Sequence, residues 1–283
     1  GSANGALRLS GSFREFKPPT YIVDAQLQQM TARISGVASP VSIRSAQFVA
    51  NETAFVLSKA TMSIPGLHSD LALNVTWPKE CASGDHGVGN ACAMKFDLTA
   101  DQLNVDEVNS LLNPKAQKRP WYAAIANTVL ASSKRSFPEV RATGKVSAGK
   151  LIVKGIPAAH FTADLSLSPD GFSLGNAAAE VFGGKYSGEL RSDFRGDTPV
   201  YISEGKLQNL ALNYLSTWMR DDWASGKVSF SYQGKAAGWN AGELLSSAVG
   251  VATFEWRDGT LRHIELDSTG KPLQFRVFAG ALE

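Results

Sequence analysis

The sequence has few charged residues, and it has no long apolar run. Of its 283 residues, 19% are charged, the formal net charge is +2, and the lysines and arginines are scattered. Nucleic-acid-binding proteins usually show a clustered basic surface, so we expect no nucleic-acid partner. No apolar run approaches the ~20 residues that a membrane-spanning helix needs, and no signal peptide opens the chain. With 43% hydrophobic residues, the chain is nonetheless able to bury a core.

Catalytic and metal-binding motifs are also missing. The sequence contains no G-x-S-x-G elbow, no P-loop and no G-x-G-x-x-G, and none of its four histidines forms a metal pair with another: His68, His86, His160 and His263. Ser268–Lys271 fits the S-x-x-K pattern of some acyl-enzymes, but Asp267–Gly270 is ordinary turn chemistry. Asp221-Asp222 fits a metal corner or half of a carboxylate pair, but a solvated loop is favoured. We therefore expect no enzyme, no metal and no cofactor.

Only two cysteines occur, Cys81 and Cys92, at the ends of a glycine-rich interval. The flexible interval lets its ends meet, which favours a disulfide that stabilises by roughly 3 kcal/mol in the loop-entropy model. Two free thiols are a second interpretation. A zinc site that recruits Asp85 and His86 is a third. A disulfide would indicate an oxidising compartment.

Alternating apolar and polar residues are what the sequence has in abundance. The stretch from His160 to Phe194 predicts four antiparallel strands, joined by turns at Pro169–Gly171 and Gly183-Gly184. Earlier, the alternation changes parity near Gln28-Gln29, which indicates a β-bulge or a strand boundary. Similar strands fill most of the remaining chain.

Short helices interrupt the strands. Residues 104–113 carry acids in a first turn and an apolar face, and a second helix opens at Pro120 with Trp121, Ile125 and Val129 on one face. A third amphipathic helix is predicted from the spacing of Leu207, Leu210, Tyr214, Leu215 and Trp218. Asn240 and Glu243 have the spacing of a capping box.

The fold class that follows is mainly β: a long curved antiparallel sheet with a few short α-helices. We divide the chain into an N-terminal β segment, a helical insert and a C-terminal β region at residues 1–103, 104–138 and 139–283. One continuous sheet through all three is the alternative. The opening Gly1-Ser2 resembles a cleavage scar, and the chain stops inside a strand-like run, so we expect a piece of a longer protein.

Each predicted strand keeps one apolar row, and three short helices are too few to cover roughly a dozen strands. We therefore expect part of this row to face an apolar trough. Its candidates in the central strands are Phe161, Leu165, Leu167, Phe172, Leu174, Val181, Tyr186 and Leu190.

The segment Val181–Gly188, VFGGKYSG, resembles the (Y/F)GGxxxG strand of the C-terminal region of the AsmA family. The similarity extends to Gly205–Leu207, to Gly250–Phe254 and to Asp258–Leu261, although Ala252 replaces the second glycine of that element. It covers about residues 95–280, and the first 90 residues match less clearly. Members of this family are similar to bridge-like lipid-transfer proteins, whose long curved sheets have an apolar concave face.

The resemblance implies a non-enzymatic periplasmic scaffold that binds phospholipid acyl chains in an apolar β-groove. It also implies anchoring to the inner membrane of a Gram-negative-type bacterium, through a part of the parent protein that this sequence does not contain. The expected role is inter-membrane phospholipid transport and outer-membrane homeostasis. The alternative is a structural or assembly protein of the cell envelope that acts through protein partners and has no lipid groove.

Overall fold

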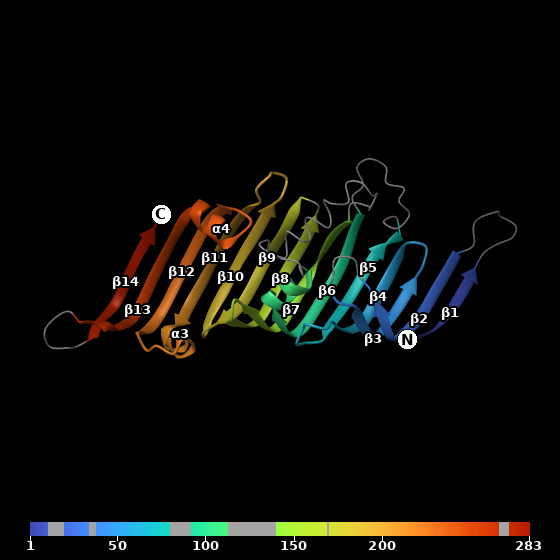
Figure 1. Cartoon of the computed structure of the whole chain (residues 1–283), viewed down its shortest axis with the longest axis horizontal. Helices are drawn as coiled ribbons and strands as arrows, with labels where there is room; N and C mark the ends of the chain where they lie inside the picture. The colour runs from blue at the N-terminus through green and yellow to red at the C-terminus, as the bar shows by residue number, and fades with distance from the viewer. Residues whose placement is uncertain (11–19, 34–37, 80–91, 113–139, 169, 266–271) are drawn as a thin grey trace.

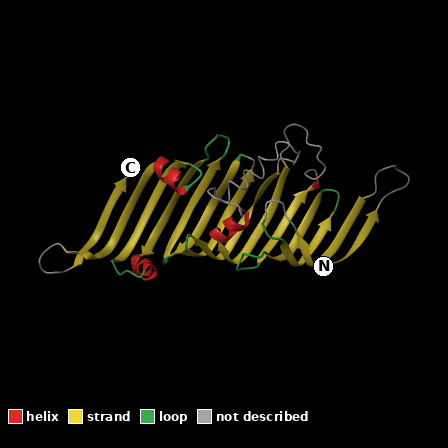
Figure 2. Cartoon of the chain, viewed as in Figure 1, coloured by secondary structure: helices red, strands yellow, loops and turns green. Residues whose placement is uncertain are grey.

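A computed structural model of the chain describes residues 1–10, 20–33, 38–79, 92–112, 140–168, 170–265 and 272–283. The described residues form one open sheet of 14 strands, and these follow each other across the sheet in chain order (Figure 1). The prediction of a mainly β fold with a few short helices is confirmed (Figure 2). The first seven strands are β1 (Ser2–Ser10), β2 (Thr20–Ala32), β3 (Val41–Ala50), β4 (Ala54–Ser63), β5 (Leu71–Pro78), β6 (Cys92–Asn104) and β7 (Val140–Val153).

The second half of the sheet consists of longer hairpins. Its strands are β8 (Ile156–Ser168), β9 (Gly171–Val181), β10 (Gly184–Asp193), β11 (Val200–Ala211), β12 (Ala224–Ala237), β13 (Val249–Glu265) and β14 (Pro272–Leu282). Each strand pairs with its neighbours in sequence, and β1 and β14 form the two open edges.

One neighbouring pair departs from the antiparallel pattern. Strands β6 and β7 pair in parallel, from Cys92 opposite Val140 to Asn104 opposite Ile152. In a parallel pair, the connecting chain must return to the end of the sheet at which the first strand begins. Residues 104–138, for which the sequence predicted a helical insert, lie in this connection. The strands before and after the insert therefore belong to the same sheet.

Polar residues with left-handed backbone interrupt six strands. Their φ angles lie between 49° and 55°, and all six side chains are exposed: Gln29, Lys59, His160, Asn176, Asn209 and Asp258. The ladders change register beside the last five of them. In β2, burial changes parity at Gln28-Gln29, as the sequence pattern predicted. Such bulges bend a strand and increase its twist.

Two predictions from the sequence were wrong because a bulge changes the periodicity of a strand. The residues from Phe172 to Val181 form the single strand β9, where two strands were predicted, because Asn176 shifts the parity within it. Leu207 and Leu210 lie in β11, where a helix was predicted. The bulge at Asn209 places residues three apart on one face, which imitates helical spacing.

Three short helices lie among the described residues: α1 (Val105–Leu112), α3 (Leu212–Met219) and α4 (Ala241–Ser247). The capping box of α4 is present, because the Asn240 side chain accepts a hydrogen bond from the amide of Glu243. None of these helices is long and apolar enough to cross a membrane. The helix predicted at Pro120 lies outside the described residues.

Candidate functional site

The eight candidate residues of the central strands all lie on one face of the sheet. Leu165 of β8 stands opposite Leu174 of β9, which stands opposite Leu190 of β10. The other members reach the same face through their own cross-strand partners, with Leu167 opposite Phe172, Tyr186 opposite Ala179, Val181 opposite Gly184, and Phe161 opposite Ala148. We call this side of the sheet the apolar face.

The same face continues toward the N-terminal edge. The cross-strand ladders carry one row from Leu190 through eight further strands without a change of face. Its members are Leu174, Leu165, Gly144, Phe96, Val75, Leu57, Phe48 and Ala25. At the edge, Leu7 and Leu9 of β1 lie opposite Val23 and Tyr21. The opposite side, the polar face, carries Asp97, Lys145 and Asp164 in one row.

Toward the C-terminal edge the apolar face becomes aromatic. Phe230 of β12 stands opposite Phe254 of β13, and the Phe254 ring lies 5.5 Å from that of Phe278 in β14. The Trp256 and Phe275 rings meet edge to face at 4.8 Å between centroids. Phe278 remains 54% exposed. The apolar face therefore extends across the sheet from β1 to β14.

The apolar side chains pack into three clusters rather than into one closed core. The first spans β2 to β8 and includes Phe161 and Leu165 at its border. The second is built on Phe172, with Leu165, Leu167, Leu174 and Leu190 packed against it. The third is built on Leu207 and Leu210, and its border includes Val181 and Tyr186. Most candidates are partly exposed, and Phe172 is the one that is buried.

In the described part of the chain, helices cover this face only near the strand ends. Leu212 and Leu215 of α3 belong to the third cluster, and Leu244 of α4 packs against the second. In Figure 2, α3 lies at one end of the strands and α4 at the other. α1 contacts the loops at its own end of the sheet, where Glu107 bonds His68 at 2.6 Å and Asp106 bonds Lys154 at 2.7 Å.

The accessible surface agrees with a single-layer architecture. The chain exposes 18523 Å². A compact monomer of 30.2 kDa would expose about 11,700 Å² by the usual scaling with mass. The open sheet, which no second layer covers in the described part of the chain, contributes to this excess. On the apolar face, Leu7, Phe230 and Phe278 are each at least 36% exposed.

One group of hydroxyls interrupts the apolar face midway along the strands, between the second and third clusters. The hydroxyls of Tyr186 in β10 and Tyr232 in β12 lie 3.1 Å apart, and the Ser203 hydroxyl of β11 lies 3.2 Å from that of Tyr232. Burial, followed by the bond with Tyr232, raises the pKa of Tyr186 above its ordinary value, so its hydroxyl stays protonated. We call these three residues the hydroxyl cluster.

Two glycines make room for this cluster. A Cβ atom on Gly188 would lie 2.5 Å from the Tyr186 hydroxyl, and one on Gly205 would lie 2.8 Å from the Tyr232 ring. The two rings therefore lie over glycine backbone. The sequence placed Tyr186 correctly on the apolar face but did not reveal its partners. Tyr232 alternates in the sequence with Val228 and Phe230, and this spacing places its ring on the same face as theirs.

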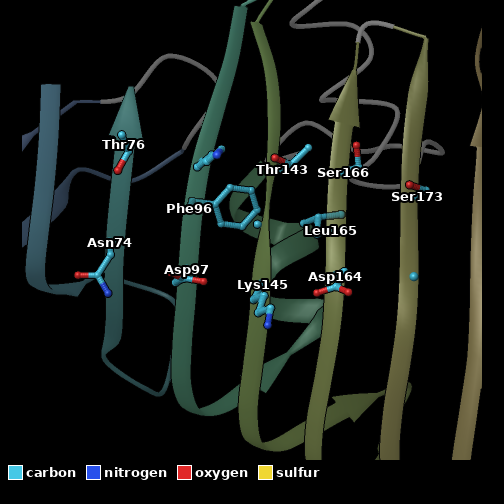
Figure 3. A pocket seen from close by; sticks show the side chains of 13 residues that line it. Asn74, Thr76, Phe96, Asp97, Thr143, Lys145, Asp164, Leu165, Ser166 and Ser173 are labelled. Carbon is cyan, nitrogen blue, oxygen red and sulfur yellow. The ribbon is translucent and has the colours of Figure 1, made fainter. Parts of the chain in front are cut away.

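Shallow hollows also lie on the polar face. One of 510 Å³ spans β5 to β9 between two rows of polar side chains (Figure 3). One row contains Asn74, Asp97, Lys145 and Asp164, and the other contains Thr76, Thr143, Ser166 and Ser173. Neighbouring charges alternate in sign along the first row, and Asn176 donates to Asp164 at 2.7 Å. Phe96, Gly144 and Leu165 also line this hollow, between the two polar rows.

The remaining candidates from the sequence fall elsewhere or outside the described residues. Asp222 forms an ion pair with Arg262, as a solvated loop would. Ser268–Lys271 and Cys81 are outside the described part of the chain, as is the side chain of Cys92, so the disulfide stays a prediction. Within the described part, no group of three or more histidine, cysteine, aspartate or glutamate side chains could hold a metal ion.

Comparison of the chain with models of protein families, with curated proteins and with solved structures found no match.

Proposed function

We propose that this protein is a non-enzymatic scaffold whose apolar face binds lipid acyl chains. The observation that carries the proposal is the continuous apolar face, which runs from β1 to β14 and which the described helices cover only near the strand ends. Monomeric soluble proteins rarely leave so large an apolar surface open to water, and such surfaces are typical of sites for apolar partners. An acyl chain matches this surface because both are long, narrow and without hydrogen-bonding groups.

The energetics favour binding that depends on chain length rather than on headgroup. Each methylene that leaves water for an apolar contact contributes ~0.8 kcal/mol. The polar headgroup would remain in solvent at the end of the strands. Selectivity among lipids should therefore be low, and a chain could move along the face while it keeps equivalent contacts.

The place of this activity in the cell rests on the resemblance given by the (Y/F)GGxxxG strand. It supports a periplasmic protein that is anchored to the inner membrane through another part of the parent protein. Phospholipid transport between the membranes, and with it outer-membrane homeostasis, is the process that such a scaffold would serve.

A role in assembly through protein partners is the second candidate, and the open edge strand β14 favours it. This strand holds few charges, and Val277, Phe278 and Leu282 are each more than half exposed. Natural sheets usually protect such edges with charges, prolines or bulges. Such an edge is suited to pairing with a further strand, either from another protein or from the rest of the parent protein.

Substitution of opposite faces of the same strands separates the two functions. Leu165→Asp with Leu190→Asp places two charges on the apolar face of β8 and β10. Ser166→Asp with Ser187→Asp places two charges on the polar face of the same strands as a matched control. We would incubate each purified protein with vesicles that contain a phospholipid with a photoreactive acyl chain, and quantify crosslinked lipid after irradiation.

If acyl chains bind the apolar face, crosslinking of the Leu165→Asp and Leu190→Asp variant should fall about ten-fold or more. The polar-face control should crosslink as much lipid as the wild type. Circular dichroism and amide exchange verify that both variants keep the sheet. Equal crosslinking of the wild type and a folded apolar-face variant would reject acyl-chain binding and favour the assembly role.

A further inference from the structure

In the hydroxyl cluster of Tyr186, Tyr232 and Ser203, the contacts determine which hydroxyl donates each hydrogen bond. The Ser203 hydroxyl lies 3.1 Å from the main-chain carbonyl of Glu189, and a carbonyl oxygen only accepts. The single hydrogen of Ser203 is therefore committed to Glu189. The contact between Ser203 and Tyr232 must then use the hydrogen of Tyr232.

The remaining contact follows by the same count. Because Tyr232 donates to Ser203, the bond between the two tyrosines must use the hydrogen of Tyr186. The chain of donors thus runs from Tyr186 through Tyr232 and Ser203 to the carbonyl of Glu189. All three hydroxyl hydrogens are used within the protein. At Tyr186, the first donor of the series, the oxygen still has a lone pair that can accept a hydrogen bond.

We propose that the hydroxyl cluster is a subsite for a lipid that carries a hydroxyl group on its apolar portion. The inference rests on the proposed acyl-chain function and adds a chemical preference to it. A ligand hydroxyl lying on the apolar face would donate to the Tyr186 oxygen without breaking any bond of the chain. A ligand ketone, which only accepts, would bind there only if Tyr186 gave up its bond to Tyr232.

The location of the cluster on the apolar face favours a hydroxylated ligand over a plain acyl chain. It lies midway along strands β10 to β12, with the Phe172 cluster toward one strand end and the Leu207 cluster toward the other. A plain acyl chain that crosses it would cover the Tyr186 oxygen and withhold water from it. Covering a polar atom without a partner is unfavourable, so a correctly placed hydroxyl is preferred over a methylene.

The test is competition between matched ligands on the whole chain. Stearate, 12-hydroxystearate and 12-ketostearate share a carboxylate and a chain length and differ only at carbon 12. Each would displace a fluorescent fatty acid from the purified wild-type protein and from Tyr186→Phe, Tyr232→Phe and Ser203→Ala. The phenylalanine variants keep the rings over the two glycines, so they should keep the fold.

For the wild type, the hydroxy ligand should compete about three- to ten-fold better than stearate or the keto ligand, the range expected for one net hydrogen bond. Tyr186→Phe should abolish this advantage, and stearate should bind it at least as tightly as the wild type, because the variant lacks the polar atom that a methylene would cover. Ser203→Ala frees the hydrogen of Tyr232, so either direction of the tyrosine bond becomes possible. The keto ligand should then approach the hydroxy ligand, a change that a merely structural role of Ser203 would not produce.

The outcomes separate the inference from the function on which it rests. If the fluorescent probe does not bind, or no ligand displaces it, acyl-chain binding itself fails. If stearate and 12-hydroxystearate compete equally, or if the hydroxyl preference survives in Tyr186→Phe, acyl-chain binding stands and the subsite is rejected.

Discussion

Replacing Ser192 by alanine removes two buried hydrogen bonds at the end of the β9–β10 pair. The Ser192 hydroxyl accepts from the amide of Phe172 at 2.7 Å and donates to the carbonyl of the same residue at 3.0 Å. The main-chain ladder of this pair ends one residue earlier, at Arg191 opposite Ser173. The side chain of Ser192 therefore joins the two strands between that residue pair and the main-chain bond from the Phe194 amide to the Asp170 carbonyl, at 2.7 Å.

The cost follows from what the substitution leaves behind. Ser192 is 7% exposed and Phe172 is 8% exposed, so water does not readily replace the lost hydroxyl. Leaving a buried donor or acceptor without its partner costs about 1–3 kcal/mol, and we expect about 2–4 kcal/mol for the two together. Because each strand contacts mainly its neighbours, this loss should stay within β8 to β11.

Amide hydrogen exchange measures this local effect. In Ser192→Ala, amides of β9 and β10 should lose protection by roughly 30- to 1,000-fold, which corresponds to that free energy at about 1.4 kcal/mol per factor of ten, while β3 to β5 should be unaffected. Ser187→Ala, on the exposed polar face of β10, is the control and should leave the exchange unchanged. Equal protection in wild type and Ser192→Ala would show that the two bonds contribute nothing, and a uniform loss across the sheet would show that the effect is not local.

Further expectations concern a bulge, a helix cap and a titrating carboxylate. Asn209→Val should destabilise β11 by about 1–2 kcal/mol in chemical denaturation, because a β-branched residue resists the left-handed backbone, whereas Asn209→Gly should be tolerated. Asn240→Ala should lower the stability of α4 by about 0.5–2 kcal/mol and increase amide exchange at its first residues. An unchanged exchange rate there would show that the cap does not stabilise the helix. Hydrogen bonds from Arg195 lower the pKa of Asp193 to about 2, so its carboxylate should stay charged until the pH falls to that value. In NMR titration the midpoint should rise toward 3.8 in Arg195→Gln, and an unmoved midpoint would show that the pair does not form in solution.

The sequence predicted the side of each central strand that is apolar, because strand periodicity is local. All eight candidate residues lie on the expected face. It did not predict where two-residue periodicity fails, since Asn176 and Asn209 shift the parity through one left-handed residue each. At Asn209 the consequence was a false helix, because i and i+3 share a face in a bulged strand as well as in a helix.

The pairing of strands that are distant in the sequence could not be predicted, for a different reason. Nothing local to β6 or β7 indicates that the two strands run in parallel, because this depends on the path of the chain between them. The hydroxyl cluster joins Tyr186, Ser203 and Tyr232 through the registers of β10, β11 and β12. Each of these residues has an ordinary strand position in the sequence, and only the ladders bring them together.

Crosslinks mapped residue by residue would show whether lipid chains lie along the apolar face. The protein would be loaded with a phospholipid that has a diazirine within its acyl chain, irradiated, digested and analysed by mass spectrometry. Binding along this face predicts crosslinks on its residues in several strands, among them Phe96, Leu165 and Leu190, with few on Lys145 or Glu189 of the polar face. Crosslinks spread equally over both faces, or their absence from the apolar face of a folded protein, would contradict lipid binding there.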